Sequence, residues 1–202
     1  MRLCERNYRV YELQPVINDC TLSTLPDYLC SGLRLVCIGL NPSLPSVRAG
    51  FYFANPRNRF WRALQASELL NVEFEPGVDA MQVLLLQYRI GFTDVVKRPT
   101  AGAKDLKVAD FREWAPQLRQ KLLHYQPDIA WFHGKLAYGN YLRHGEALRQ
   151  DVDWGPQPHR IGRTRAFVTP NPSPANAAYS LEDLSAWYRQ LGAYVSRFEC
   201  HP

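Results

Sequence analysis

Apolar residues along the chain gather into short runs, each followed by glycine, proline or small polar residues. The four clearest runs are residues 33–40 (LRLVCIGL), 90–96 (IGFTDVV), 129–132 (IAWF) and 166–169 (AFVT). Mostly apolar runs of this kind are typical of strands buried on both faces of a parallel sheet. We therefore predict a strand at each run, with residues 90–96 forming either a strand or an extended loop.

The segments between these runs have apolar residues at helical spacing. Helices are predicted over residues 78–87, 107–125 and 134–141, and a last helix follows Ser180, whose side chain suits an N-cap. Pro116 lies inside the second of these helices and is expected to kink or split it.

Another helix is predicted to begin at Asn55-Pro56. Asparagine is favoured at the N-cap and proline at the first helical position. Phe60, Trp61 and Leu64 would then form its apolar face.

Strands that alternate with helices indicate an α/β fold, here a three-layer α/β/α domain with a central, mainly parallel twisted sheet. Residues 1–31 contain prolines and scattered polar residues, and they are predicted to form an N-terminal extension packed on or beside a domain of residues 32–202. Ligands of such sheets bind at the carboxyl ends of the strands. Two proline-containing loops, 39–43 and 170–176, are expected there.

Composition places the chain among ordinary intracellular proteins. With 202 residues, 46% of them hydrophobic and 21% charged, it can bury a core without disulfides or metal. It has no stretch long enough to span a membrane and no signal-peptide pattern. We expect it in the cytoplasm, at the nucleoid, if the source is bacterial, and in the nucleus if it is eukaryotic.

The cysteines are odd in number and contain no C-x-x-C pair; they are Cys4, Cys20, Cys30, Cys37 and Cys200. Metal and iron–sulfur sites usually show closely spaced ligands. We therefore expect reduced thiols, with Cys37 in the core, and neither a metal nor another cofactor.

A formal net charge of +5 is compatible with an anionic partner such as DNA. The basic residues form short clusters within residues 57–62, 97–98, 104–107 and 160–165. Charge alone fits a solvated basic surface and a DNA-binding surface equally well.

Three segments carry candidate chemistry. In residues 39–43 (GLNPS), Pro42 fixes the backbone of Asn41, whose neutral amide is able to orient a water molecule. Residues 171–177 (NPSPANA) form a stiff loop of small polar residues that suits close approach to phosphates. Asp94 lies at the end of a predicted strand. Taken singly, these features are also typical of a turn, a rigid connector and a helix cap.

Taken together, the segments resemble the mismatch-specific uracil/thymine-DNA glycosylases of the uracil-DNA glycosylase superfamily. Residues 39–43 are similar to the first family motif, G-I-N-P-G, and residues 55–61 (NPRNRFW) to the stretch that follows it. Residues 91–94 through 104–106 match another segment, and residues 171–173 (NPS) resemble the second motif. Several ordered matches at compatible spacing make the resemblance specific.

The resemblance implies a monofunctional DNA glycosylase that rotates uracil out of a G·U mismatch and hydrolyses its N-glycosidic bond, leaving an abasic site. It implies Asn41 and Asp94 as catalytic residues. Base binding would involve Gly39, Leu40, Phe53 and Asn171. Ser43 and Ser173 would contact phosphates, and Pro174, Ala175 and Asn176 would form the wedge. The expected partner is double-stranded DNA, bound by a monomer without a membrane.

Departures from the family pattern change the expected activity. The strongest uracil glycosylases carry histidine where this chain has Asn171, so a modest turnover rate is expected. The wedge residues are small and uncharged, which weakens the expected grip on the opposite strand. Asp94 stands where relatives carry asparagine or lysine, and it would either accept the N3–H of uracil or act as a second general base.

Other interpretations stay open. One is a broader glycosylase for ethenocytosine, xanthine or thymine. Another is a mismatch-binding module without catalysis, although a pure binder has no need of a placed amide at Asn41. An unrelated nucleotide-binding enzyme lacks support, because neither G-x-G-x-x-G nor a P-loop occurs.

Overall fold

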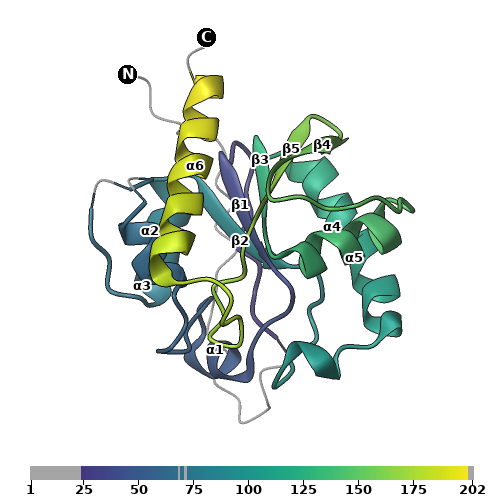
Figure 1. The fold of residues 1–202 in the computed structure, drawn as a ribbon, viewed down its shortest axis with the longest axis horizontal. Coiled ribbons are helices and arrows are strands. Elements are labelled where there is room, and N and C mark those ends of the chain that lie inside the picture. Colours follow the sequence, from purple (N-terminus) through teal and green to yellow (C-terminus); the bar gives the residue numbers. More distant parts are fainter. Residues whose placement is uncertain (1–23, 68, 71, 200–202) are drawn as a thin grey trace.

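The computed structural model describes residues 24–67, 69–70 and 72–199, and the five strands found there form one sheet in the order β2-β1-β3-β5-β4 (Figure 1). The strands are β1 (Leu35–Gly39), β2 (Ile90–Asp94), β3 (Ile129–His133), β4 (Gly155–Ile161) and β5 (Thr164–Thr169). All neighbouring pairs are parallel except β4 and β5.

Helices cover both faces of the sheet, because successive strand residues point to opposite sides and both sides are apolar. On β1, Leu35 and Cys37 pack with α2 (Phe60–Gln65), α3 (Val78–Leu86) and α6 (Leu181–Glu199). Val36 and Ile38 pack instead with α4 (Val108–Tyr125) and α5 (Lys135–Gly145). Figure 1 shows the same three layers. The predicted α/β/α architecture with a mainly parallel sheet is confirmed, as is the burial of Cys37.

The predicted helix start at Asn55-Pro56 is wrong, since α2 begins at Phe60 with Arg59 as its N-cap. Oδ1 of Asn55 accepts a hydrogen bond from the backbone N–H of Arg57 at 2.9 Å, which closes a local turn. Oδ1 of Asn58 then accepts from the N–H of Phe60 at 2.9 Å and satisfies the first turn of the helix.

Other boundaries differ from the prediction in instructive ways. α4 runs unbroken through Pro116 and is not split. The last helix is capped as predicted, because Oγ of Ser180 accepts from the N–H of Asp183 at 3.1 Å. Two short elements were not predicted: α1 (Leu44–Ala49), capped by Ser43, and a single 3₁₀ turn, η1 (Ala103–Asp105).

Part of the predicted N-terminal extension belongs to the core as far as it is described. Leu25 and Tyr28 are buried among core residues, and Tyr28 forms a β-bridge with Phe92 of β2. Residues 1–23 lie outside the described part of the chain, so the division at residue 31 stays a prediction. Of the cysteines, Cys4, Cys20 and Cys200 also lie outside it.

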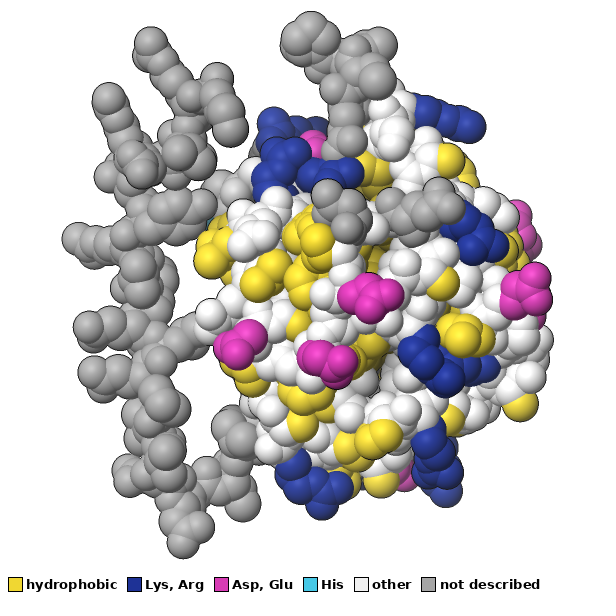
Figure 2. Space-filling model, turned by 90° about the vertical axis from the view of Figure 1, so that its left-hand side faces the viewer, with side chains coloured by type: hydrophobic (Ala, Val, Ile, Leu, Met, Phe, Trp, Pro, Cys, Tyr) yellow, Lys and Arg dark blue, Asp and Glu magenta, His cyan; other side chains and the backbone are white. Residues whose placement is uncertain are grey.

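Viewed from the side of α2 and α3, the surface carries basic and acidic side chains in small separate groups with apolar side chains between them (Figure 2). Val72, before α3, and Val78 and Leu86, the first and last residues of α3, are exposed apolar side chains. None of the described helices is both long and apolar enough to cross a membrane.

Candidate active site at the carboxyl edge of the sheet

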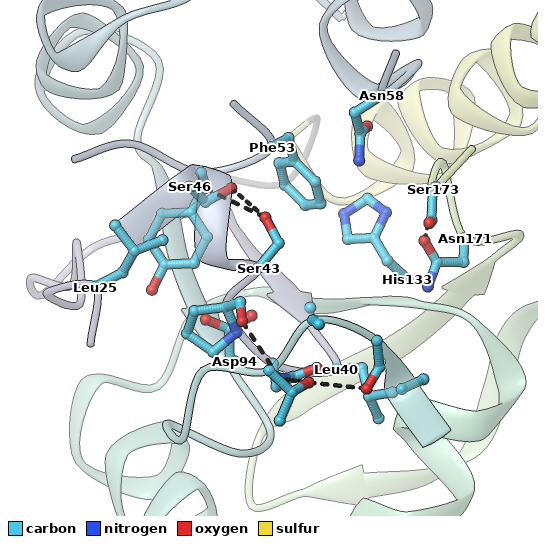
Figure 3. A pocket seen from close by; sticks show the side chains of 18 residues that line it. Leu25, Leu40, Ser43, Ser46, Phe53, Asn58, Asp94, His133, Asn171 and Ser173 are labelled. Atoms are coloured by element: carbon cyan, nitrogen blue, oxygen red, sulfur yellow. Dashed lines mark hydrogen bonds between the residues drawn. The ribbon is translucent and has the colours of Figure 1, made fainter. Parts of the chain in front are cut away.

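A cavity of about 160 Å³ opens at the carboxyl ends of β1, β2 and β3, where the sequence predicted the site (Figure 3). Eight predicted residues line it: Gly39, Leu40, Asn41, Ser43, Phe53, Asp94, Asn171 and Ser173. Cavities on the order of 150 Å³ hold a benzene molecule. The space therefore matches a single six-membered ring.

The three remaining predicted residues lie outside this cavity. Pro174 and Ala175 are exposed on the loop that follows β5. Asn176 lines an adjacent cavity, which shares Leu40 and Asn171 with the first one. The loop thus stands at the rim, where a wedge would need to be.

The amide of Asn41 is held in one orientation. Its Nδ2 donates to Oγ1 of Thr100 at 2.8 Å, to the carbonyl of Arg98 at 3.1 Å and to that of Pro42 at 3.3 Å. Oδ1 of Asn41 accepts no hydrogen bond from any described residue. The side chain therefore presents a fixed acceptor beside the cavity, as the positioning of a water molecule requires.

Asp94 ends β2 opposite Gly39 of β1 and is 4% exposed. Its Oδ1 lies so close to the Cα of Gly39 that a Cβ there would overlap it, which explains the glycine. Its Oδ2 is buried without a hydrogen bond. Burial raises the pKa of Asp94 to about 7, although the nearby Lys97 ammonium lowers it. A carboxyl group with this pKa exchanges a proton near neutral pH.

Phe53 forms an aromatic wall of the cavity. The ring stacks on that of Phe60 at a centroid distance of 4.0 Å and meets the ring of His133 edge-on at 5.2 Å. Its backbone has a φ of 59°, in the left-handed region that non-glycine residues rarely adopt. The neighbouring Tyr52 also lines the cavity, but its side chain is buried among the core residues.

Sequence reasoning missed His133, the last residue of β3. The imidazole lines the cavity beside Phe53 and Asn171, is 1% exposed, and has no hydrogen bond to either ring nitrogen within the described structure (Figure 3). Burial lowers the pKa of His133 to about 3, so the ring is neutral. A neutral imidazole offers one donor and one acceptor to a bound group.

Ser43 joins the first loop to the aromatic wall. As the N-cap of α1, its Oγ accepts from the N–H of Ser46 at 3.3 Å and donates to Oγ of Ser46 at 2.9 Å. Oγ of Ser46 in turn accepts from the N–H of Ala54 at 3.2 Å, next to Phe53. The position of Phe53 is thereby tied to the loop that carries Asn41.

The second loop, residues 170–179, is fastened by Arg59. Its side chain donates to the carbonyl oxygens of four loop residues: Pro172 at 3.3 Å, Ser173 at 2.6 Å, Asn176 at 2.8 Å, and Tyr179. Within the loop, Oδ1 of Asn171 accepts from the N–H of Ser173 at 2.9 Å. Arg59 therefore positions the loop, and its guanidinium is committed to backbone oxygens.

Other basic residues predicted from clustering are also engaged elsewhere. Lys97 is buried and lies 2.8 Å from Asp27, while Arg98 pairs with Asp110 at 2.6 Å. The cluster at residues 160–165 flanks the turn before β5, at the sheet edge away from the cavity. Of the predicted clusters, the one at residues 97–98 is therefore paired with carboxylates, and the one at residues 160–165 lies away from the cavity.

A groove lined by basic residues runs along α5, between α4 and the loop that follows α5, and it is called the basic groove below. It consists of two adjoining hollows that are lined in part by Lys135, Arg112, Arg143 and Arg149. Through Ala103 and Leu136 it reaches the region of the cavity. The three arginines are exposed, and no described acidic residue forms an ion pair with them. The pKa of the half-buried His144 is lowered by burial and by these three guanidinium groups.

No cluster of metal-ligating side chains is present among the described residues. The side chains that line the cavity include an amide, a carboxyl group, an imidazole and an aromatic ring.

Comparison with known proteins agrees with this geometry. Residues 26–192 match the model of the uracil DNA glycosylase superfamily. The fold is also similar to the solution structure of a candidate uracil DNA glycosylase from Methanosarcina acetivorans, with a TM-score of 0.54, 21% identity, and coverage of 87% of this chain and 98% of that one. At this identity the structural match supports the fold alone. Because the family model covers most of the chain, the protein belongs to the uracil DNA glycosylase superfamily and is a DNA glycosylase, a hydrolase of N-glycosyl bonds.

Proposed function

We propose that this chain is a monofunctional glycosylase that removes uracil from G·U mismatches in double-stranded DNA and leaves an abasic site. The observation that supports this proposal most directly is the cavity of about 160 Å³, which Asn41 and Asp94 line together with Phe53 and His133. A uracil inside a duplex is out of reach, so the nucleotide rotates into this cavity.

In the cavity the base lies against Phe53, since base–aromatic stacking contributes about 1–3 kcal/mol per base. The neutral imidazole of His133 donates one hydrogen bond to a uracil oxygen, as its unpaired buried nitrogens suggest. Asn171 and the backbone of Gly39 and Leu40 line the same space. A donor fixed at a uracil oxygen stabilises the negative charge of the departing base.

Hydrolysis needs a water molecule on the sugar side of the base. Oδ1 of Asn41 accepts a hydrogen bond from that water, and its direction is fixed by the acceptors around Nδ2. Asp94 takes up a proton as the water attacks C1′, because its pKa of about 7 makes it an effective base near neutral pH. No lysine of the described residues lines the cavity, which favours simple hydrolysis over strand cleavage.

Contacts at the rim support flipping. Ser43 and Ser173 contact phosphates, and Pro174, Ala175 and Asn176 enter the space that the flipped nucleotide leaves. These wedge residues are small, so they offset little of the cost of breaking a base pair. Because that cost is least at a mismatch, a small wedge favours G·U over A·U.

Single-turnover cleavage of labelled duplexes tests the proposal. We expect abasic sites, revealed by alkali, from G·U faster than from A·U. The same assay on G·T, ethenocytosine and xanthine measures the substrate range, and cleavage of these at similar rates would establish the broader glycosylase. Retained duplex binding without cleavage of any base would make the protein a binding module.

The basic groove predicts where the flanking DNA backbone lies. Replacing Arg143 and Arg149 together by glutamine should weaken binding of a G·U duplex and make the slope of log affinity against log salt shallower by about 2, since each phosphate contact contributes about 0.9. Arg160 and Arg163 are a matched control, because both are exposed at the opposite edge of the sheet. Affinity for the duplex is measured by fluorescence anisotropy. An equal loss of affinity in the two double variants would indicate only a general effect of net charge.

A further inference from the structure

A partly buried cluster of charged groups lies beside Asp94. Nζ of Lys97 donates to Oδ1 of Asp27 at 2.8 Å and to the hydroxyl of Tyr52 at 3.1 Å. The same Nζ lies 3.9 Å from Oδ2 of Asp94, too far for a hydrogen bond and close enough for strong charge interaction.

Asp27 organises this cluster with both carboxylate oxygens. Its Oδ1 also accepts from Oγ1 of Thr93 at 2.8 Å, and its Oδ2 accepts from Nζ of Lys121 of α4 at 2.6 Å. Two ammonium groups thus share one carboxylate. One of them, that of Lys97, is buried, since its side chain is only 7% exposed. Hydrogen bonds with neutral partners would not compensate the burial of such a charge.

The arrangement places charges of both signs around one catalytic candidate. The charged and titratable groups facing Asp94 are Lys97 from the chain after β2, Asp27 from the segment before β1, Lys121 from α4 and Tyr52 from the loop after α1. Gly39, on the strand beside it, contributes no charge. The ionisation of Asp94 therefore depends on the opposing charges of Asp27 and Lys97.

We propose that Asp27 and Lys97 are positioning residues for excision, whose opposite charges, held beside Asp94 by their ion pair, together set the pH at which Asp94 accepts a proton from water. This inference rests on the proposed role of Asp94 as a general base. A purely structural ion pair that fastens residues 24–29 to α4 is the competing explanation, and it predicts lower stability without a change in the pH profile.

The two positioning residues are expected to shift the pH profile in opposite directions. The single-turnover rate should rise with pH as Asp94 loses its proton. Asp27→Asn removes a negative charge and leaves two ammonium groups, which favours ionised Asp94, so the midpoint of this rise should move down by about one pH unit. Lys97→Met removes the nearest positive charge, so the midpoint should move up by about one unit or more. Lys97→Arg keeps the charge and should restore a midpoint near that of the wild type.

Two further variants control for folding and distance. Lys121→Met removes the ammonium that donates to Oδ2 of Asp27 and has the smaller charge effect on Asp94, so it should shift the midpoint less than Lys97→Met does. The double variant Asp27→Asn/Lys97→Met removes both signs, so its midpoint should lie between those of the single variants. Thermal unfolding of each variant identifies any that fail to fold, and the comparison then rests on the remaining ones.

A second measurement separates this inference from the proposed function. The carboxyl carbon of Asp94, followed by NMR through a pH titration, reports its ionisation without any DNA. Opposite shifts in Asp27→Asn and Lys97→Met would support the coupling, and unchanged midpoints in folded variants would overturn it. If the wild type cleaves none of the DNA substrates, the proposed function fails, while the NMR titration still decides whether the coupling exists.

Discussion

Replacing Asp94 by asparagine is expected to slow excision from a G·U duplex by about 10²- to 10⁴-fold, the usual contribution of a positioned general base. Asparagine fills the same space over Gly39 and still accepts a hydrogen bond from the N3–H of uracil. It does not take up a proton from water. The variant therefore separates the two roles open to Asp94, since a base contact alone predicts a nearly unchanged rate.

The same substitution should stabilise the protein, in a manner that depends on pH. The folded-state pKa of Asp94 is about 7, against 3.8 in the unfolded chain. Between these values the folded state binds more protons, so stability falls as pH rises from about 4 to about 7. The lost stability approaches about 4 kcal/mol above pH 7, at about 1.4 kcal/mol per pKa unit. Asp94→Asn should recover much of it at pH 8 and little at pH 4.

Urea unfolding at pH 4, 6 and 8 measures this gain, and single-turnover cleavage measures the rate. Asn41→Ala is the matched comparison, because it removes the water acceptor and leaves the carboxyl group in place. A full rate in Asp94→Asn together with an inactive Asn41→Ala would assign activation of the water to Asn41 alone. A stability gain that is equal at all three pH values would show that Asp94 is not buried as an ionisable group.

The strands that build the site could be predicted because they are buried on both faces. Residues 33–40 and 129–132 consist mainly of apolar side chains, and a parallel sheet covered by helices requires that pattern. β4 was not predicted, because it is an edge strand that alternates buried and exposed residues and contains Pro156 and Pro158. Proline is tolerated at an edge, where a backbone N–H is not needed by a neighbouring strand.

Residue types and motifs identified the lining of the cavity more reliably than they identified charge partners. Two of the lining residues are at strand ends, since Asn41 follows β1 and Asp94 ends β2, and Phe53 lies in the loop after α1. The carboxyl ends of parallel strands meet at one edge of the sheet, so the sequence already indicated a common site. His133 gave a weaker signal, a single polar residue that ends an apolar strand before Gly134. Such a histidine is recognised as a site residue only when its unpaired ring nitrogens and its cavity are seen.

The positions of the basic side chains could not be predicted, because a cationic residue looks the same in sequence whether it faces solvent, a carboxylate or a backbone carbonyl. Lys97 is buried against Asp27, a residue assigned by sequence to the N-terminal extension. Arg59 is turned toward a loop more than a hundred positions later in the chain. Long-range partners of this kind depend on the tertiary fold, which local patterns do not encode.

The loop after β5 shows how strongly one such partner is expected to matter. Internal hydrogen bonds close the turn, with the N–H of Asn176 donating to the carbonyl of Ser173 at 3.0 Å and Nδ2 of Asn176 donating to that of Asn171 at 2.9 Å. These bonds shape the loop, yet they do not fasten it to the rest of the site. The planar guanidinium of Arg59 does so, because its forked donors reach several carbonyl oxygens at once.

Arg59→Met is therefore expected to lower the excision rate by about 10²-fold, the loss that a displacement of about 1 Å causes in a positioned site. Arg59→Lys should recover little of it, since an ammonium is a point donor without the guanidinium fork. Arg62→Met is the matched control, because Arg62 is exposed on α2, and it should keep the wild-type rate. Single-turnover cleavage measures the rate, and hydrogen exchange of residues 171–179 measures the order of the loop.

The two readings together decide how the loop is held. Faster exchange in Arg59→Met, with a slower reaction and an unchanged Arg62→Met, would show that Arg59 keeps the wedge aligned with Asn41 and Asp94 across the cavity. Unchanged exchange and rate in Arg59→Met would mean that the prolines and the Asn171–Asn176 bonds suffice. Arg59 would then only donate hydrogen bonds to carbonyl oxygens that water molecules are able to bind in its place. The first outcome is favoured by the carbonyl oxygens of Asn176 and Tyr179, which accept from the Arg59 side chain. The carbonyl of Pro172 also accepts from the backbone N–H of Arg59 at 3.1 Å, and that of Ser173 accepts from the N–H of Asn176.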